Sequence, residues 1–239
     1  SAMTTNLKLA WALFFLVPGI TFADGPDKQT PEEIAAAKAV IEKDFKNKVL
    51  PRSLTAEAKR TVLSKYPHLD PKKEVPTDLL EDTVVFFDQN KASFPNQAYI
   101  TVIDLGRRSD RQRFWVIDMA SGVVESFWTL HGWGSDKNDD GFAEAFSNVI
   151  NSGTSSLGFI RTAEIYSGKF KRSIRLDGLS TTNSNVRERA IVLHGFDTAY
   201  QRPVKQGLGW GCPALDWTVK DGVIDNVAEG SLMYIGVAK

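Results

Sequence analysis

The sequence predicts a mainly β fold, a β-sandwich or partial barrel, with a helical extension at its N-terminus. From residue 91 onward, short β-branched and aromatic runs alternate with glycine-rich turns, a pattern typical of sandwiches and barrels. The segment 24–90 is instead charged and carries apolar residues at helical spacing. We therefore divide the chain into a leader at 1–23, a helical region with linker at 24–90, and a β-rich domain at 91–239.

The first 23 residues have the pattern of an export signal. Lys8 precedes the apolar run 9–17, and Ala23 ends a small-residue cleavage pattern. Ser1 and Ala2, which precede Met3, resemble an expression scar. The apolar run is too short to span a bilayer comfortably, and no cysteine near it could carry a lipid. We expect an exported protein, periplasmic or secreted, with no stable membrane anchor after signal cleavage.

Three helices are predicted before the β-rich domain. Thr30, Pro31 and Glu33 form the start signal of the first, an N-cap with a capping box, and apolar spacing carries it to about Lys48. The second spans 55–66 and the third 77–90, with a proline-bounded linker between them. These helices could form a cap, a partner surface or a spacer.

Seven strands and one further helix are expected after residue 90. The strand segments share β-branched and aromatic content and lie at 98–105, 113–119, 123–130, 158–166, 173–176, 190–193 and 232–237. A helix is expected at 217–228. The polar segment 134–156 is long enough to be a functional loop.

Composition excludes several classes of function. The 29 basic and 29 acidic residues balance, and no basic stripe is interleaved with aromatics, which argues against nucleic acid as a partner. One cysteine allows no intrachain disulfide. Three scattered histidines without paired cysteines give no zinc spacing, so we expect no zinc site.

The candidate active site is built on Cys212, the only cysteine, and His194. A thiol reacts as thiolate, and a nearby imidazole is the usual group that takes its proton. Glycines at 207, 209 and 211 allow backbone amides to approach a substrate. The alternative is a cysteine that is only a small buried hydrophobe. An unpaired thiol in an exported protein, set among glycines, favours the catalytic interpretation.

These residues resemble the L,D-transpeptidase (YkuD-like) family, which has a His-Gly element followed by Gly-Cys, here His194-Gly195 and Gly211-Cys212. The match is closest to the murein L,D-transpeptidase branch, in which Pro-Ala follows the cysteine. Four further segments resemble that branch in the same order: 131–132, 146–148, 155–158 and 189–192. The similarity covers roughly residues 77–238 and implies an L,D-transpeptidase-like β fold.

The resemblance implies acyl transfer on peptidoglycan stem peptides. The Cys212 thiolate would attack meso-diaminopimelate of a donor tetrapeptide, and His194 would move the proton. The carbonyl of Gly195 would orient the ring, and the amides of Trp210, Gly211 and Cys212 would form the oxyanion hole. An acceptor amine would resolve the thioester into a 3→3 cross-link, or the terminal D-amino acid would be exchanged. Carbapenems would label the cysteine, and no metal or organic cofactor would be required. The implied substrate-binding residues are His131, Asn148, Ser155, Ser156, Gly209 and Arg189.

The chain also departs from the family pattern. Gly209 replaces a serine, Trp210 stands where many relatives carry histidine, and no arginine follows the cysteine. These changes leave nucleophile and base in place and bear on acceptor choice. An L,D-carboxypeptidase or endopeptidase on the same scaffold therefore stays open, as does a non-catalytic murein-binding module. Papain-like and caspase-like cysteine proteases have a different order or spacing of cysteine and histidine.

Overall fold

The computed structural model describes residues 27–239, so the expected leader lies outside the described residues. The N-terminal region contains α1 (Pro31–Asp44), η1 (Pro51–Ser53), α2 (Ala56–Leu63), α3 (Thr77–Gln89) and η2 (Lys91–Ser93). The expected capping box is present, because the Glu33 amide donates to Thr30 Oγ1 at 3.2 Å and the Thr30 amide donates to Glu33 Oε2 at 2.8 Å. The helix ends at Asp44, earlier than its apolar spacing predicts.

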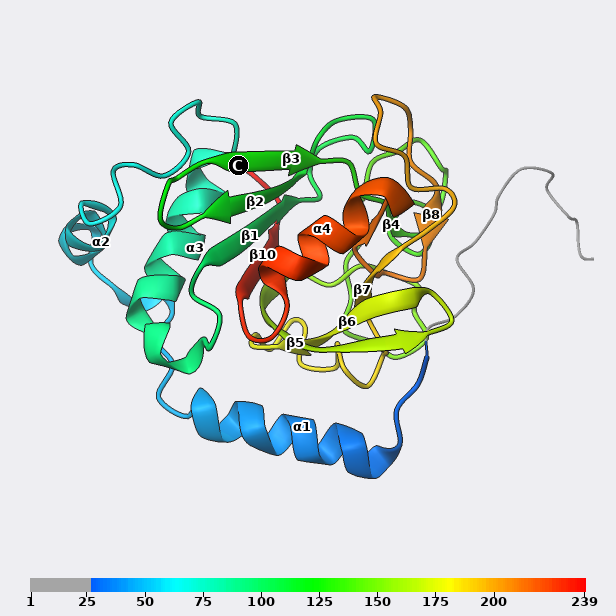
Figure 1. The fold of residues 1–239 in the computed structure, drawn as a ribbon, viewed down its shortest axis with the longest axis horizontal. Helices are drawn as coiled ribbons and strands as arrows, with labels where there is room; N and C mark the ends of the chain where they lie inside the picture. The colour runs from blue at the N-terminus through cyan, green and yellow to red at the C-terminus, as the bar shows by residue number, and fades with distance from the viewer. Residues whose placement is uncertain (1–26) are drawn as a thin grey trace, which may run out of the picture.

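Helix α1 lies against the body of the protein through Ile41, which packs partly buried against the hydrophobic core, and through ion pairs. None of its residues is buried, and Figure 1 shows it along the lower edge, apart from the other helices. Lys38 pairs with Glu188 at 3.0 Å and Asp44 with Arg161 at 2.8 Å. The half-exposed Lys38–Glu188 pair contributes little stability, whereas Arg161 is largely buried in its pair with Asp44. Helix α1 therefore contributes less buried apolar surface than α3, which has several buried residues.

One eight-stranded sheet forms the centre of the molecule. Its strands are β1 (Tyr99–Asp104), β2 (Phe114–Asp118), β3 (Val124–Phe127), β5 (Gly158–Gly168), β6 (Lys171–Gly178), β7 (Val192–Gly195), β9 (Ala214–Leu215) and β10 (Leu232–Gly236). They are ordered β3-β2-β1-β10-β5-β6-β7-β9. A separate two-stranded sheet pairs β4 (His131–Gly132) with β8 (Leu208–Gly209).

The sheet carries a hydrophobic core on each face because successive side chains along each strand point to opposite faces. In β2, Trp115 and Ile117 join the core under α3, whereas Phe114 and Val116 join the opposite core. Helix α4 (Trp217–Val227) covers this opposite core, which contains Phe114 and Val116. Figure 1 shows α3 and α4 on the two sides of the sheet.

The fold prediction, mainly β with an N-terminal helical extension, is confirmed. Within residues 27–239, no helix combines the length and apolar character needed to cross a bilayer. The third N-terminal helix contributes to the domain core: Phe86 of α3 stacks on Phe159 of β5 with ring centroids 4.0 Å apart. The sheet and its short parallel strands β7 and β9 then position the site.

Candidate active site

His194 lies on β7, and Cys212 lies in the turn just before the adjoining strand β9. Strands β7 and β9 pair in parallel, with His194 opposite Ala214, and Cys212 precedes Ala214 by two residues. The Val192 amide, two residues before His194, donates to Cys212 Sγ at 3.4 Å. The sulfur therefore lies beside the strand that carries the histidine, although 17 residues separate the two in sequence.

The surroundings of His194 fix its tautomer. Nδ1 lies 2.9 Å from the Gly195 carbonyl oxygen; a carbonyl only accepts, so Nδ1 carries the hydrogen and Nε2 keeps the lone pair. Phe170, at the tip of the β5–β6 hairpin, stacks on the ring with centroids 4.0 Å apart. Burial lowers the pKa of His194 from 6.5 to about 4, so the imidazole is neutral at pH 7 and can accept a proton at Nε2.

The thiol of Cys212 is sealed from solvent in this state. The residue is 3% exposed, its sulfur contacts the Ala190 carbonyl oxygen at 3.9 Å, and the cavity beside it measures about 10 Å³. Burial raises the pKa of the thiol from 9.0 to about 11. Thiol and imidazole are thus both neutral between about pH 4 and pH 11. A substrate can reach the sulfur only when a covering segment moves.

The segment 147–156 lies over the turn before Cys212. Gly211 has φ +108°, and a Cβ there would overlap the carbonyl oxygen of Thr154. The amides expected to form the oxyanion hole, those of Trp210, Gly211 and Cys212, belong to this turn, which joins β8 to β9. Only glycine permits both this backbone conformation and this close approach.

Arg189 also contacts the segment 147–156, through hydrogen bonds from its guanidinium. Its guanidinium donates four hydrogen bonds, all to neutral oxygens: Ser147 O at 2.8 Å, Ser156 Oγ at 2.5 Å, Ser152 Oγ at 3.2 Å and Thr154 O at 2.6 Å. Arg189 and Ser156, both predicted to bind substrate, are thus bonded to each other in this state.

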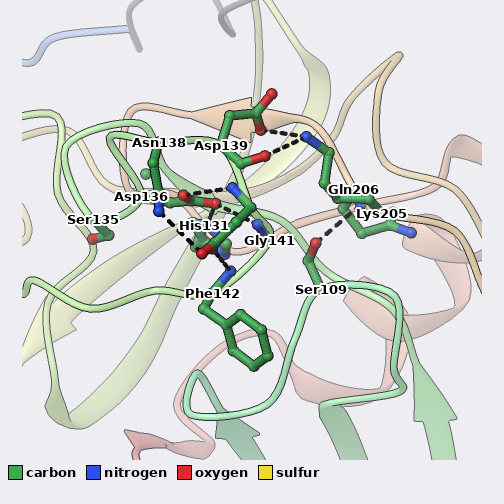
Figure 2. A network of polar contacts seen from close by, with 12 residues as sticks. Ser109, His131, Ser135, Asp136, Asn138, Asp139, Gly141, Phe142, Lys205 and Gln206 are labelled. Atoms are coloured by element: carbon green, nitrogen blue, oxygen red, sulfur yellow. Dashed lines mark hydrogen bonds and ion pairs between the residues drawn. The ribbon is translucent and has the colours of Figure 1, made fainter.

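His131 lies in a buried polar network, not at an open cleft (Figure 2). Arg113 donates to its Nδ1 at 2.7 Å, so its Nε2–H donates to Asp136 at 3.1 Å. Asp136 also accepts from the amides of Asp140 and Gly141. Burial, then the Arg113 charge, lower the pKa of His131 to about 4. Protein groups engage both ring nitrogens of His131, so the lone pair that could act as base belongs to His194.

The other predicted substrate-binding residues hydrogen-bond to, or pair with, the backbone of neighbouring segments. Asn148 bridges to the amide of Asn185 at 2.9 Å, and Ser155 Oγ accepts from the Gly132 amide at 3.0 Å. Gly209 pairs with Gly132 between β8 and β4. Trp210 packs edge-on against Trp133, with ring centroids 5.8 Å apart.

Three residues of the site were not predicted from the sequence. Phe170 covers His194, while Arg113 and Asp136 hold His131. Phe170 lies in a hairpin turn and Arg113 at a strand start, where spacing carries no signal of contact with a histidine. Across the described part of the chain, no group of three or more His, Cys, Asp or Glu side chains is arranged to hold a metal ion.

A family model described as the L,D-transpeptidase catalytic domain (YkuD_2) matches residues 71–235. No curated protein matches the chain. Similar solved structures include L,D-transpeptidase 1 of Mycobacterium tuberculosis, at 11% identity and TM-score 0.34, covering 58% of this chain and 62% of that one. The L,D-transpeptidase of Mycobacterium smegmatis has 12% identity and TM-score 0.36, covering 58% of each chain. That of Xylanimonas cellulosilytica (residues 123–326) has 13% identity and TM-score 0.34, covering 91% and 99%. The chain thus spans about six-tenths of the length of the two mycobacterial structures.

Proposed function

Because this chain belongs to the L,D-transpeptidase catalytic-domain family, we propose that it is a peptidoglycan L,D-transpeptidase that works through a Cys212 thioester. The observation that carries the proposal is the pairing of β7 with β9. It sets the only cysteine beside the strand of a histidine whose tautomer leaves Nε2 free to accept a proton. Acyl transfer requires this combination of nucleophile and base.

In the first half-reaction, Cys212 Sγ bonds to the carbonyl carbon of meso-diaminopimelate in a donor tetrapeptide stem. The thiol proton passes to His194 Nε2, and the bond to the terminal D-alanine breaks. The same proton then leaves with the D-alanine amine, so the imidazole returns to its neutral form. Backbone amides of Trp210, Gly211 and Cys212 would stabilise the oxyanion of the tetrahedral intermediate, at roughly 3 kcal/mol for each donor.

In the second half-reaction, an amine attacks the thioester and His194 takes its proton and returns it to the sulfur. A side-chain amine of a second stem gives a 3→3 cross-link, and a free D-amino acid gives exchange. We further propose that the protein acts outside the cytoplasmic membrane, where peptidoglycan lies, after export directed by the segment 1–23.

The test is mass analysis of the products formed from purified tetrapeptide muropeptides. Dimers joined between two diaminopimelate residues support transfer, whereas trimmed monomers alone would identify an L,D-carboxypeptidase or endopeptidase. Cys212→Ala is expected to abolish turnover and carbapenem labelling while keeping a cooperative thermal transition. Binding of muropeptides by wild type without any product would instead indicate a non-catalytic murein-binding module.

His194→Gln separates the base from the nucleophile. Glutamine has no basic nitrogen, so turnover is expected to fall by about 10²-fold or more, while Cys212 stays available for slow alkylation. His68→Gln is the matched control because His68 is exposed and bonded to Met119 O at 2.9 Å, outside the β7–β9 pair. Equal turnover in the two variants would contradict the role of His194.

A further inference from the structure

Arg189 is a buried cation without an anion. It is 7% exposed, and its four hydrogen bonds all go to uncharged oxygens. No carboxylate of residues 27–239 forms an ion pair with it. Arg187, two residues earlier and 5% exposed, pairs with Asp177 at 2.6 Å and Glu164 at 2.7 Å. Buried charges are ordinarily paired in this second manner, because an unpaired one costs several kcal/mol.

The nucleophile lies within reach of this charge. Arg189 precedes Ala190, whose carbonyl oxygen contacts Cys212 Sγ. Its guanidinium also bonds the carbonyl oxygen of Thr154, which packs against Gly211, the neighbour of Cys212. Arg189 is therefore connected to the thiol along two short paths.

The other ionisable groups near Cys212 cannot supply a counter-charge. Tyr166, from β5, is neutral at pH 7 because burial raises its pKa to about 12. Arg175 stacks on Tyr166, with its guanidinium 3.8 Å from the ring centroid, and donates a hydrogen bond to the backbone carbonyl oxygen of Asp27. His194, on β7, is neutral at pH 7. Burial raises the pKa of the thiol, and the Val192 amide and then the Arg189 charge lower it. Burial lowers the pKa of Arg189, and a Cys212 thiolate opposes that effect.

We propose that Arg189 is a positioning residue whose buried positive charge stabilises the Cys212 thiolate, in addition to holding the segment 147–156 over the site. The proposal rests on the proposed function only in taking Cys212 as the nucleophile. In the resting thiol state the guanidinium has hydrogen bonds but no counter-charge. Formation of the thiolate gives it one, so nucleophile formation is favoured without a permanent ion pair.

The experiment measures the ionisation midpoint of the single cysteine from its ultraviolet thiolate absorbance, with Cys212→Ala subtracted to remove the tyrosine signal. Arg189→Gln removes the charge, and its midpoint is expected to rise by about one pH unit or more, a roughly tenfold loss of thiolate at a given pH. Arg189→Lys keeps the charge and is expected to keep the midpoint within about half a unit of wild type.

Two further variants separate charge from hydrogen bonding. Ser156→Ala removes one neutral acceptor of Arg189 and is expected to leave the midpoint unchanged. Arg189→Met supplies a second neutral replacement, suited to a buried site by its flexible apolar side chain, should the glutamine variant fail to fold. A wild-type midpoint in the neutral variants, or a lysine variant that titrates like them, overturns the proposal.

This measurement uses no substrate, so its outcome is independent of the muropeptide assay. A raised midpoint in a protein that forms no products from muropeptides would support the role of Arg189 and contradict the transpeptidase. If the protein forms products but its thiol midpoint is the same with and without the Arg189 charge, the result would support the transpeptidase and contradict the role of Arg189.

Discussion

The buried His131 makes the protein labile to acid. Its Nδ1 accepts a hydrogen bond from Arg113 at 2.7 Å. Protonation of Nδ1 would break this bond and place the new positive charge beside the guanidinium. The pKa of His131 is lowered from 6.5 to about 4, and the unfolded chain therefore takes up the proton first as pH falls. Stability is fully present above pH 6.5 and is lost as pH falls from there toward 4. With these values, about 2.5 kcal/mol is lost between about pH 7.5 and about pH 4.5.

The perturbation is His131→Asn, which removes the titrating ring but keeps an oxygen near the position of Nδ1 to accept from Arg113. The variant loses the bond to Asp136 at 3.1 Å and is expected to be less stable than wild type at neutral pH by roughly 1–3 kcal/mol. Its pH dependence is expected to be smaller, because the contribution of His131 is gone. Urea unfolding at the two pH values gives all four free energies.

The comparison isolates His131 because other titrating groups act in both proteins. His194, whose pKa burial also lowers to about 4, loses its stabilising contribution over the same pH range in wild type and variant, so its effect cancels in the difference. His68→Gln, at an exposed position, controls for removal of an imidazole as such. Equal losses of stability on acidification in wild type and His131→Asn would refute the reasoning, since His131 would then not be held neutral by burial and the Arg113 charge.

Three further predictions concern the covering of the site and the core. Gly211→Ala, at φ +108° and against the carbonyl of Thr154, is expected to cost roughly 2–4 kcal/mol and to abolish turnover; an unchanged melting temperature would contradict this. Asp27→Ala removes the carboxylate that accepts from the amide of residue 169 at 2.8 Å, in the hairpin whose Phe170 stacks on His194. Loosening this hairpin exposes the imidazole that takes the thiol proton, so alkylation of Cys212 is expected to be several-fold faster. An unchanged alkylation rate would show that this contact does not limit access. Phe86→Ala opens a cavity in the fully buried core under α3, and urea unfolding is expected to show a loss of about 3–5 kcal/mol; a loss below about 1 kcal/mol would contradict the packing.

The elements with a strong local signal could be predicted from the sequence. The capping box at Thr30 and Glu33 fixes the start of α1, and the apolar runs mark the long strands. The end of α1 and its contacts could not be predicted, because its apolar spacing suggested a packed face and the helix buries none of its residues. The strands β8 and β9 have two residues each, too few for periodicity, and exist only through pairing with distant segments.

The chemistry of the site could be predicted more fully than its surroundings. Cys212 and His194 stand out by residue type, and the Gly195 carbonyl lies 2.9 Å from the ring. The partner of His131 could not be found, because Arg113 lies 18 residues away and its contact depends on the pairing of β2 with β3. Motif position predicted a substrate-binding role for His131, which stays a prediction; its burial and its two hydrogen bonds depend on the fold.

Burial of the Cys212 thiol keeps a potentially reactive group protonated. A thiolate is the form that is oxidised, so a buried and protonated cysteine is protected from oxidation. Burial keeps Cys212 protonated, with its pKa raised to about 11, and keeps His194 unable to hold the proton until the site opens. Arg189 already lies beside the turn with its charge unpaired among the described residues. Opening of the segment 147–156 to a substrate would therefore admit the acyl donor and reduce the burial that keeps the thiol neutral, so that nucleophile formation is coupled to substrate entry.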